Sequence, residues 1–159
     1  ASFGLDGLAH AAEALTGKAI GQRSKEAFRQ SVRISLKWSL IFSAGIAFVF
    51  LLFGPVIIRA LTDLEDVRVT AMRFLPWLII SPLVSVWAFL YDGVFVGATR
   101  AIEMRNSMLI SSFLVFVPAW YLLQGFGNHG LWLAFTIFMA SRGIGMHLYY
   151  KRRVLPAIE

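Results

Sequence analysis

The sequence predicts an all-α fold, a polytopic bundle of about five transmembrane helices of which the first is only partial. Apolar residues make up 58% of the 159 residues and charged residues 15%, and the mean hydropathy is +0.69. Soluble domains are about 45–50% apolar and about 25% charged. Long runs also lack any formal charge, and basic residues gather in alternate connectors between these runs. A soluble domain of this composition would have to hide far more apolar surface than its size allows.

Four apolar runs are long enough to cross the hydrocarbon core, which takes about 20 residues. We expect helices at about 34–58, 70–98, 106–124 and 130–150, in a single membrane domain that covers 1–159. The last two come from one run that is too long for a single span, and the Gly- and Asn-rich stretch 124–130 divides it. A partial helix at about 1–17 comes first, and the basic segment 18–33 is expected to be a cytoplasmic loop.

The distribution of Lys and Arg predicts the orientation of the bundle. Twelve of the fifteen Lys and Arg residues lie in the segments 18–37, 99–105 and 142–153, whereas the connector 59–73 is balanced and the turn 124–130 is uncharged. Basic residues mark the cytoplasmic side of a membrane protein. We therefore expect a multi-pass protein of the plasma (inner) membrane with a cytoplasmic C-terminus. Topology accounts for the positive charge, so the expected partner is the lipid bilayer and not nucleic acid.

One group of ionisable residues lies in the first, partial helix. The spacing of Asp6, His10 and Glu13 places all three on one helix face. They could form a stripe that handles protons or cations in a wet cavity, because a His between carboxylates can titrate near neutral pH. They could equally form a polar face that binds neighbouring helices, and the sequence leaves both interpretations open.

A second ionisable residue, Asp92, lies about 12 Å along the chain from Arg100. A charge at this depth usually faces protein or water. Asp92 is a candidate for binding a coupling ion or a substrate charge, and it could instead pair with a basic residue or cap a helix break at Gly93. Arg142 is expected to extend its side chain towards the cytoplasmic end of its span. Ser111 is expected to be a helix-packing residue.

No motif in the sequence indicates an enzyme. No stretch matches a nucleophile elbow, a phosphate-binding loop or a zinc motif, and neither His129 nor His147 has a partner at metal-ligand spacing. The sequence has no cysteine, which excludes disulfides and thiolate ligands. We therefore expect no catalytic residues, no metal site and no cofactor.

Two stretches resemble a known family. The stretch from Leu5 to Gly21, LDGLAHAAEALTGKAIG, resembles the eighth helix of multidrug and toxic compound extrusion (MATE) transporters of the DinF-like branch. The stretch from Tyr91 to Arg100, YDGVFVGATR, followed by EMRNS from Glu103, resembles the end of the tenth helix and the loop after it. The resemblance runs through the whole chain, although the apolar spans between these stretches are less specific.

The resemblance implies twelve helices in two six-helix lobes that exchange a proton or sodium ion for organic, often cationic, drugs by alternating access. On this mapping the chain is a C-terminal fragment covering the eighth helix, in part, to the twelfth, and its missing partner is the N-terminal lobe. Asp92 matches the acidic residue that the family uses for cation coupling, while Asp6 and Glu13 receive no assigned role. The expected aromatic walls of a cavity for a small organic substrate are Trp87, Phe89, Tyr91 and Trp120.

Three other interpretations stay open. The chain could belong to a secondary transporter of another family, to a lipid-flipping relative of the same broad fold, or to a membrane scaffold that does not transport. A basic cavity lining would favour lipid flipping, and tolerance of changes at Asp92 and Glu13 would favour a scaffold. Because one incomplete lobe cannot alternate around a central site, we expect the chain by itself to be inactive.

Overall fold

The computed structural model describes residues 2–158, which form helices and no strand. This confirms the predicted all-α fold. The first three helices are α1 (Ser2–Gly21), α2 (Lys25–Leu61) and α3 (Glu65–Gly97). A fourth rod joins α4 (Ala101–Ile110), a π-helical stretch (Ser111–Phe116), α5 (Val117–Leu123) and a 3-10 turn (Gln124–Phe126). The fifth rod is α6 (Asn128–Tyr149), which continues into a π-helical turn (Tyr150–Val154) and a 3-10 turn (Leu155–Ala157).

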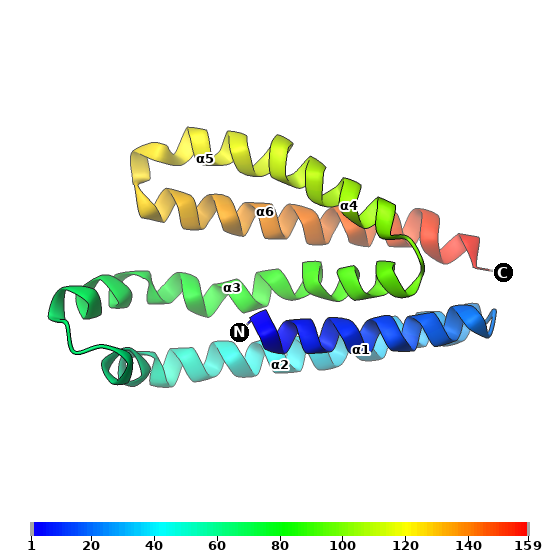
Figure 1. Cartoon of the computed structure of the whole chain (residues 1–159), viewed down its shortest axis with the longest axis horizontal. Helices are drawn as coiled ribbons and strands as arrows, with labels where there is room; N and C mark the ends of the chain where they lie inside the picture. The colour runs from blue at the N-terminus through cyan, green and yellow to red at the C-terminus, as the bar shows by residue number, and fades with distance from the viewer. Residues whose placement is uncertain (1, 159) are drawn as a thin grey trace.

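Helix α3 lies at the centre of the bundle. It packs against α1 and α2 on one side and against α6 on the other, and the rod of α4 and α5 packs on α6 (Figure 1). The side chains of Leu90, Tyr91, Val94 and Phe95 of α3 are almost completely buried. The buried residues of α3 all lie between Pro82 and Phe95, so its C-terminal half is the part that the neighbouring helices cover.

The outer surface of the bundle is apolar. In the described part of the chain, four helical segments are long and apolar enough to cross a membrane: Lys25–Leu61, Glu65–Gly97, Ala101–Phe126 and Asn128–Ala157. Large apolar side chains such as Leu61, Leu114 and Leu122 are exposed on the outer helices. An exposed apolar surface of this extent is what lipid covers in a membrane protein.

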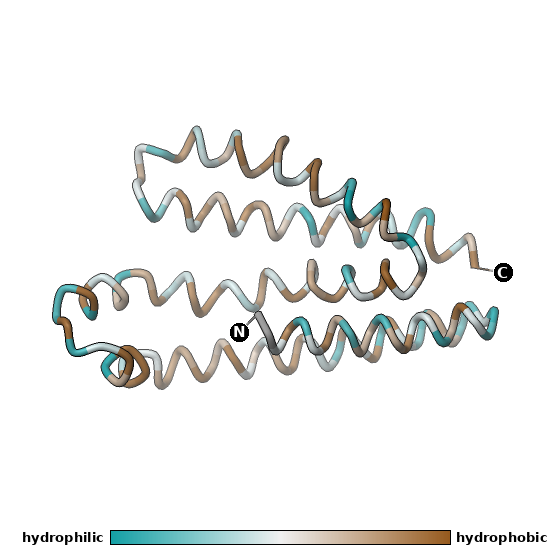
Figure 2. The backbone as a smooth tube through the Cα atoms, viewed as in Figure 1, coloured by the Kyte–Doolittle hydropathy of each residue, from teal (hydrophilic) through white to brown (hydrophobic). Residues whose placement is uncertain are grey.

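Basic residues gather at one end of the bundle. The end of α1, the start of α2, the link from α3 to α4 and the chain's C-terminus all lie at the same end (Figure 1). Figure 2 shows hydrophilic residues there and at the opposite connectors, with hydrophobic helices between them. The α1–α2 turn, the link 99–105 and the C-terminal residues 151–153, which hold most of the Lys and Arg residues in or near them, therefore share one end of the bundle.

The basic segment 18–33 is not a loop, so that prediction is wrong. Helix α1 continues to Gly21 and α2 begins at Lys25. Only a tight turn separates them, in which Arg23 has a φ of 50° and the Ser24 hydroxyl accepts a hydrogen bond from the Ala27 amide at 3.2 Å. Phe28 and Val32 are buried while the neighbouring Lys and Arg residues are exposed. The segment is thus amphipathic, and helices extend beyond the uncharged runs used to locate them.

Two other helices also begin earlier than predicted. Helix α3 begins before the predicted residue 70, and the fourth rod begins at Ala101 instead of 106. The predicted division at 124–130 is confirmed. Gly127 there has a φ of +56° and a ψ of −135°, which a residue with a side chain rarely adopts. Pro118 has no amide to donate to the carbonyl four residues earlier, which accounts for the π-helical stretch beside it.

Glycines allow α1 and α3 to approach closely. A Cβ atom on Gly93 would lie 2.0 Å from the carbonyl oxygen of Ala9, and one on Gly97 would lie 2.2 Å from the Thr16 hydroxyl. No real side chain fits at such distances without moving the backbone. Small residues at helix contacts are the usual means by which membrane helices pack closely, and here they bring the polar face of α1 against α3.

We predict that Gly93→Ala destabilises the bundle by about 1–3 kcal/mol, the usual cost of overpacking a close contact. The added methyl group would have to push α1 away from α3. Thermal unfolding in detergent measures the effect. Gly45→Ala is the control, because a Cβ at Gly45 meets nothing within 4 Å. Equal melting temperatures for the two variants would contradict the close approach.

Candidate functional site

Asp92 faces a small cavity between three helices. The cavity has a volume of about 180 Å³. Its walls come from α1, α3 and α4, and they include Asp6, His10, Glu13, Phe89, Asp92 and Met104. The two groups of ionisable residues found in the sequence, one on α1 and one on α3, therefore meet in a single site. Sequence spacing alone did not bring them together, because more than 70 residues separate them.

An ion pair joins Asp92 to α6. The Nη2 atom of Arg142 lies 2.6 Å from both carboxylate oxygens of Asp92. The Arg142 side chain is 10% exposed and the Asp92 side chain 24%. The expectation that Arg142 extends to the membrane surface is therefore wrong in this structure. Opposite charges in a low-dielectric setting attract strongly, and Asp92 offers a closer partner than the surface does.

The polar residues of α1 are more exposed than Asp92. His10 Nδ1 lies 3.3 Å from Glu13 Oε2, and the His10 side chain is 80% exposed. Asp6 is half-buried on the same helix face. These side chains form the open edge of the cavity, while Asp92 lies deeper against α6. The arrangement offers three carboxylates and one imidazole to a cation that enters from the α1 side.

The predicted aromatic residues do not share one cavity. Phe89 lines the cavity of Asp92. Trp87 lines a different, mostly apolar cavity of about 540 Å³ between α2, α3 and α6, together with His147 and Gly143. Trp120 lies on α5 with 44% of its surface exposed and borders neither cavity, because α5 packs on the far side of α6.

Tyr91 is buried between α3 and α6. Its side chain is 1% exposed, its hydroxyl is hydrogen-bonded to His147 Nδ1, and its ring lies 5.7 Å from that of Tyr150. Tyr91 therefore fixes α3 to α6 one residue before Asp92. It does not line the cavity of Asp92, although the sequence suggested a role there.

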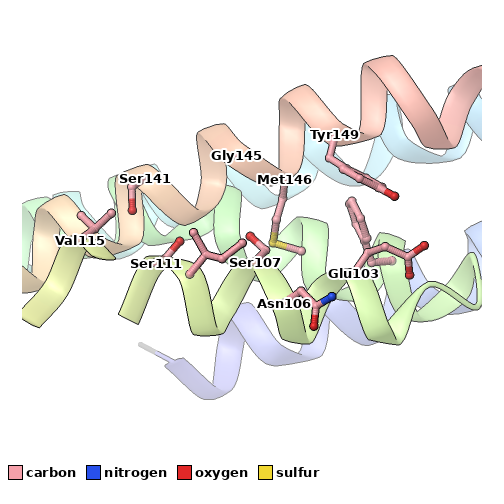
Figure 3. Close-up of a pocket in the computed structure, with 11 residues that line it drawn as sticks. Glu103, Asn106, Ser107, Ser111, Val115, Ser141, Gly145, Met146 and Tyr149 are labelled. Atoms are coloured by element: carbon pink, nitrogen blue, oxygen red, sulfur yellow. The ribbon is translucent and has the colours of Figure 1, made fainter. Parts of the chain in front are cut away.

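A third cavity was not anticipated from the sequence. It has a volume of about 440 Å³ and lies between α3, α6 and the rod that begins with α4 (Figure 3). Glu103, Ser107 and Ser111 line it from one side, and Ser141 and Tyr149 from the other. Glu103 also forms an ion pair with Arg100 at 2.9 Å. The signal was present in the sequence, because Glu103, Ser107 and Ser111 recur every four residues and so share a helix face.

The site combines a small charged cavity with larger, less polar ones. A cavity of about 180 Å³ is smaller than the roughly 300–1,000 Å³ of pockets that bury a drug-sized ligand. It can take an inorganic cation or the charged end of an organic one. The apolar cavity beside Trp87 is large enough for an aromatic or aliphatic group. The arrangement suits ion binding and contact with an amphiphilic cation.

We predict that Tyr91→Phe lowers the stability of the bundle by about 0.5–1.5 kcal/mol, the usual net worth of a hydrogen bond. The change removes the hydroxyl that binds His147 and keeps the ring. Tyr121→Phe is the matched control, because Tyr121 is exposed on α5. Thermal unfolding of both variants in detergent measures the difference, and a loss confined to the control would contradict the assignment.

Comparison with known proteins identifies the family. The MatE family model matches residues 3–122. DNA damage-inducible protein F of Escherichia coli (strain K12) is 41% identical over 151 residues, which cover 95% of this chain and 33% of that protein. A structure of a multidrug resistance MATE family transporter of the MOP superfamily, in an inward-facing conformation, matches with a TM-score of 0.79 and 18% identity, over 94% of this chain and 35% of that one. At that identity the match shows the fold. The chain spans about a third of the length of these relatives, and it belongs to the MatE family, the multidrug and toxic compound extrusion family that its sequence resembles.

Proposed function

We propose that this chain forms part of a secondary active antiporter that exports organic, often cationic, compounds in exchange for protons or sodium ions by alternating access. Family membership supports a transport role, and the matched structure is that of a multidrug resistance transporter. The chain covers about a third of such proteins, so the activity belongs to a complete transporter with an N-terminal lobe. The chain by itself is expected to be inactive, and it supplies one wall of the transport site.

The observation that carries this proposal is the position of Asp92. It lies inside a helix that is long and apolar enough to cross a membrane, and it opens onto a cavity that also holds Asp6, His10 and Glu13. An ionisable residue at the bilayer centre costs about 2.5–3.5 kcal/mol on insertion scales, so such residues usually serve an ion or substrate pathway. A structural ion pair alone would not require an open cavity beside it.

Charge exchange at Asp92 would couple ion and drug movement. An organic cation is attracted to the ionised carboxylate, and a proton or sodium ion that binds the carboxylate removes this attraction. The cation and the coupling ion therefore compete for one group. The apolar cavity beside Trp87 and His147 would hold the hydrophobic part of the compound. Binding of substrate and ion within the membrane-spanning part is common among secondary transporters.

Lipid flipping is less well supported by the cavity. Anionic headgroups would need a basic lining, and the buried base among the residues described, Arg142, already neutralises Asp92. The three cavity residues on α1 that can ionise are two acids and a histidine. This charge pattern favours cations.

The basic end of the bundle sets the proposed orientation. Positive residues favour the cytoplasmic side, so the C-terminus and the α1–α2 turn would lie in the cytoplasm of the inner membrane. Single cysteines placed in the uncharged turn 124–130 of the complete transporter should react with a membrane-impermeant thiol reagent added outside spheroplasts. Cysteines placed at 151–153 should react only after the membrane is opened. The reverse pattern would contradict the orientation.

We predict that Asp92→Asn in the complete transporter reduces drug export at least about tenfold, because a 1.4 kcal/mol loss of cation binding is already tenfold. The amide keeps the size of the side chain and removes its charge. Export by everted vesicles, with the proton and sodium gradients varied separately, measures the effect. The matched control is Asp66→Asn, which makes the same change at an exposed position in the first turn of α3. Unchanged export and unchanged ion dependence in Asp92→Asn would remove Asp92 from the coupling mechanism.

A further inference from the structure

Arg142 contacts Asp92 closely, but through only one of its guanidinium nitrogens. One guanidinium nitrogen, Nη2, reaches both carboxylate oxygens at 2.6 Å. The most stable arginine–carboxylate pairs use two nitrogens in parallel. The Nε atom of Arg142 is buried and has no hydrogen-bond partner among residues 2–158. A guanidinium that serves only as a permanent structural link would be expected to satisfy this buried donor.

Arg142 and the cavity approach Asp92 from different helices. Arg142 comes from α6, whereas the cavity is bounded by α1, α3 and α4 and does not include Arg142 among its lining residues. A cation that enters between Asp6, His10 and Glu13 therefore reaches a carboxylate that already holds a positive charge. The guanidinium cannot lose its proton in a protein, so it cannot make room by becoming neutral.

A second cation that binds the carboxylate oxygens of Asp92 would lie beside the guanidinium, which already contacts both oxygens at 2.6 Å. Like charges this close repel each other strongly where the dielectric constant is low. A sodium ion or an organic cation can bind Asp92 only if Arg142 withdraws, and a proton on Asp92 also releases Arg142. We propose that Arg142 is an internal competitor cation, which holds Asp92 in the unloaded site and has to be displaced for cargo to bind. This inference rests on the proposed cation site at Asp92 and adds a specificity-determining residue to it.

The structure also indicates what moves. A Cβ atom on Gly143 would lie 2.8 Å from the Cβ of Trp87, so the backbone beside Arg142 is packed closely against α3. Displacement is therefore a movement of the long Arg142 side chain and not of α6. Seven residues separate Arg142 from Tyr149 at the end of the helix, about 10 Å at 1.5 Å per residue. A long basic side chain can extend towards the membrane surface over part of this distance.

The experiment measures binding of tetraphenylphosphonium, a monovalent organic cation, to the purified complete transporter. If Arg142 occupies Asp92 in about nine tenths of the unloaded molecules, removing its charge makes the apparent Kd about tenfold smaller. Arg142→Gln is expected to show this decrease. In transport assays the same variant should lower both KM and kcat, because cargo binds more tightly and no internal cation helps to expel it. A purely structural role would not lower KM.

Control variants separate competition from general effects. Arg105→Gln removes the same charge from an exposed position on α4 and should leave the Kd unchanged. Arg142→Lys keeps a positive charge without the planar fork and should lower the Kd by a smaller factor, about two- to threefold. An unchanged or larger Kd in a monodisperse, folded Arg142→Gln protein would overturn the proposal. If Arg142→Gln does not fold, the Kd of Arg142→Lys decides. An unchanged Kd in Arg142→Lys would show that the pair is a structural link. Failure of both variants to fold would show the same.

Asp92→Asn distinguishes this inference from the function on which it rests. If Asp92→Asn weakens cation binding and Arg142→Gln does not strengthen it, only the competitor role of Arg142 is wrong. If Asp92→Asn leaves both cation binding and ion dependence unchanged, Asp92 is not the cation site, and both proposals fail. In the double variant, Asp92→Asn should cancel the gain produced by Arg142→Gln, because the competing group and its target are then both absent.

Discussion

The site depends on one ion pair, which neutralises the negative charge of Asp92 inside an apolar bundle. Asp92 lies in the central helix with 24% of its side chain exposed, and an isolated charge there would be costly. The Arg142 guanidinium of α6 provides the compensation at 2.6 Å, and this requires α3 and α6 to be neighbours. Tyr91 and His147 strengthen the same contact by a hydrogen bond one residue away. The pairing of α3 with α6 and the charge balance of the site are therefore parts of the same arrangement.

Close packing of α1 against the other side of α3 brings the remaining ionisable residues into the site. Gly93 follows Asp92 directly, and it brings the Ala9 backbone of α1 so near that no side chain fits between them. As a result, Asp6, His10 and Glu13 lie along one cavity with Asp92. A bulkier residue at 93 would move α1 outward and separate the carboxylates. The glycine is a requirement of helix packing, and the shared cavity is its functional consequence.

The bundle separates charge recognition from contact with apolar groups. The cavity that contains the carboxylates is small, and the cavity beside Trp87 is about three times larger and mostly apolar. The first is bounded by α1, α3 and α4, and the second by α2, α3 and α6. An amphiphilic cation needs both kinds of surface, since its charge is stabilised by carboxylates and its body by apolar side chains.

The membrane class, the number of helices and the family followed from the sequence alone. Uncharged runs of about 20 residues have a direct physical cause in the thickness of the bilayer, and the alternation of basic connectors reflects the sidedness of membranes. These signals are local along the chain, so one sequence is enough to detect them. Asp92 was also identified in this way, because a charge within an apolar run is conspicuous without any knowledge of its neighbours.

Only the tertiary structure decided which residues meet. The sequence placed Arg142 at the membrane surface and Trp120 in a cavity, and it treated 18–33 as a loop. The structure pairs Arg142 with Asp92, exposes Trp120 and makes most of 18–33 helical. Each of these outcomes depends on which helix faces lie together, and helix faces are set by close contacts such as Gly93 against Ala9. Apolar composition drives helices into the membrane, but it does not specify their rotation, because lipid and protein neighbours are equally apolar.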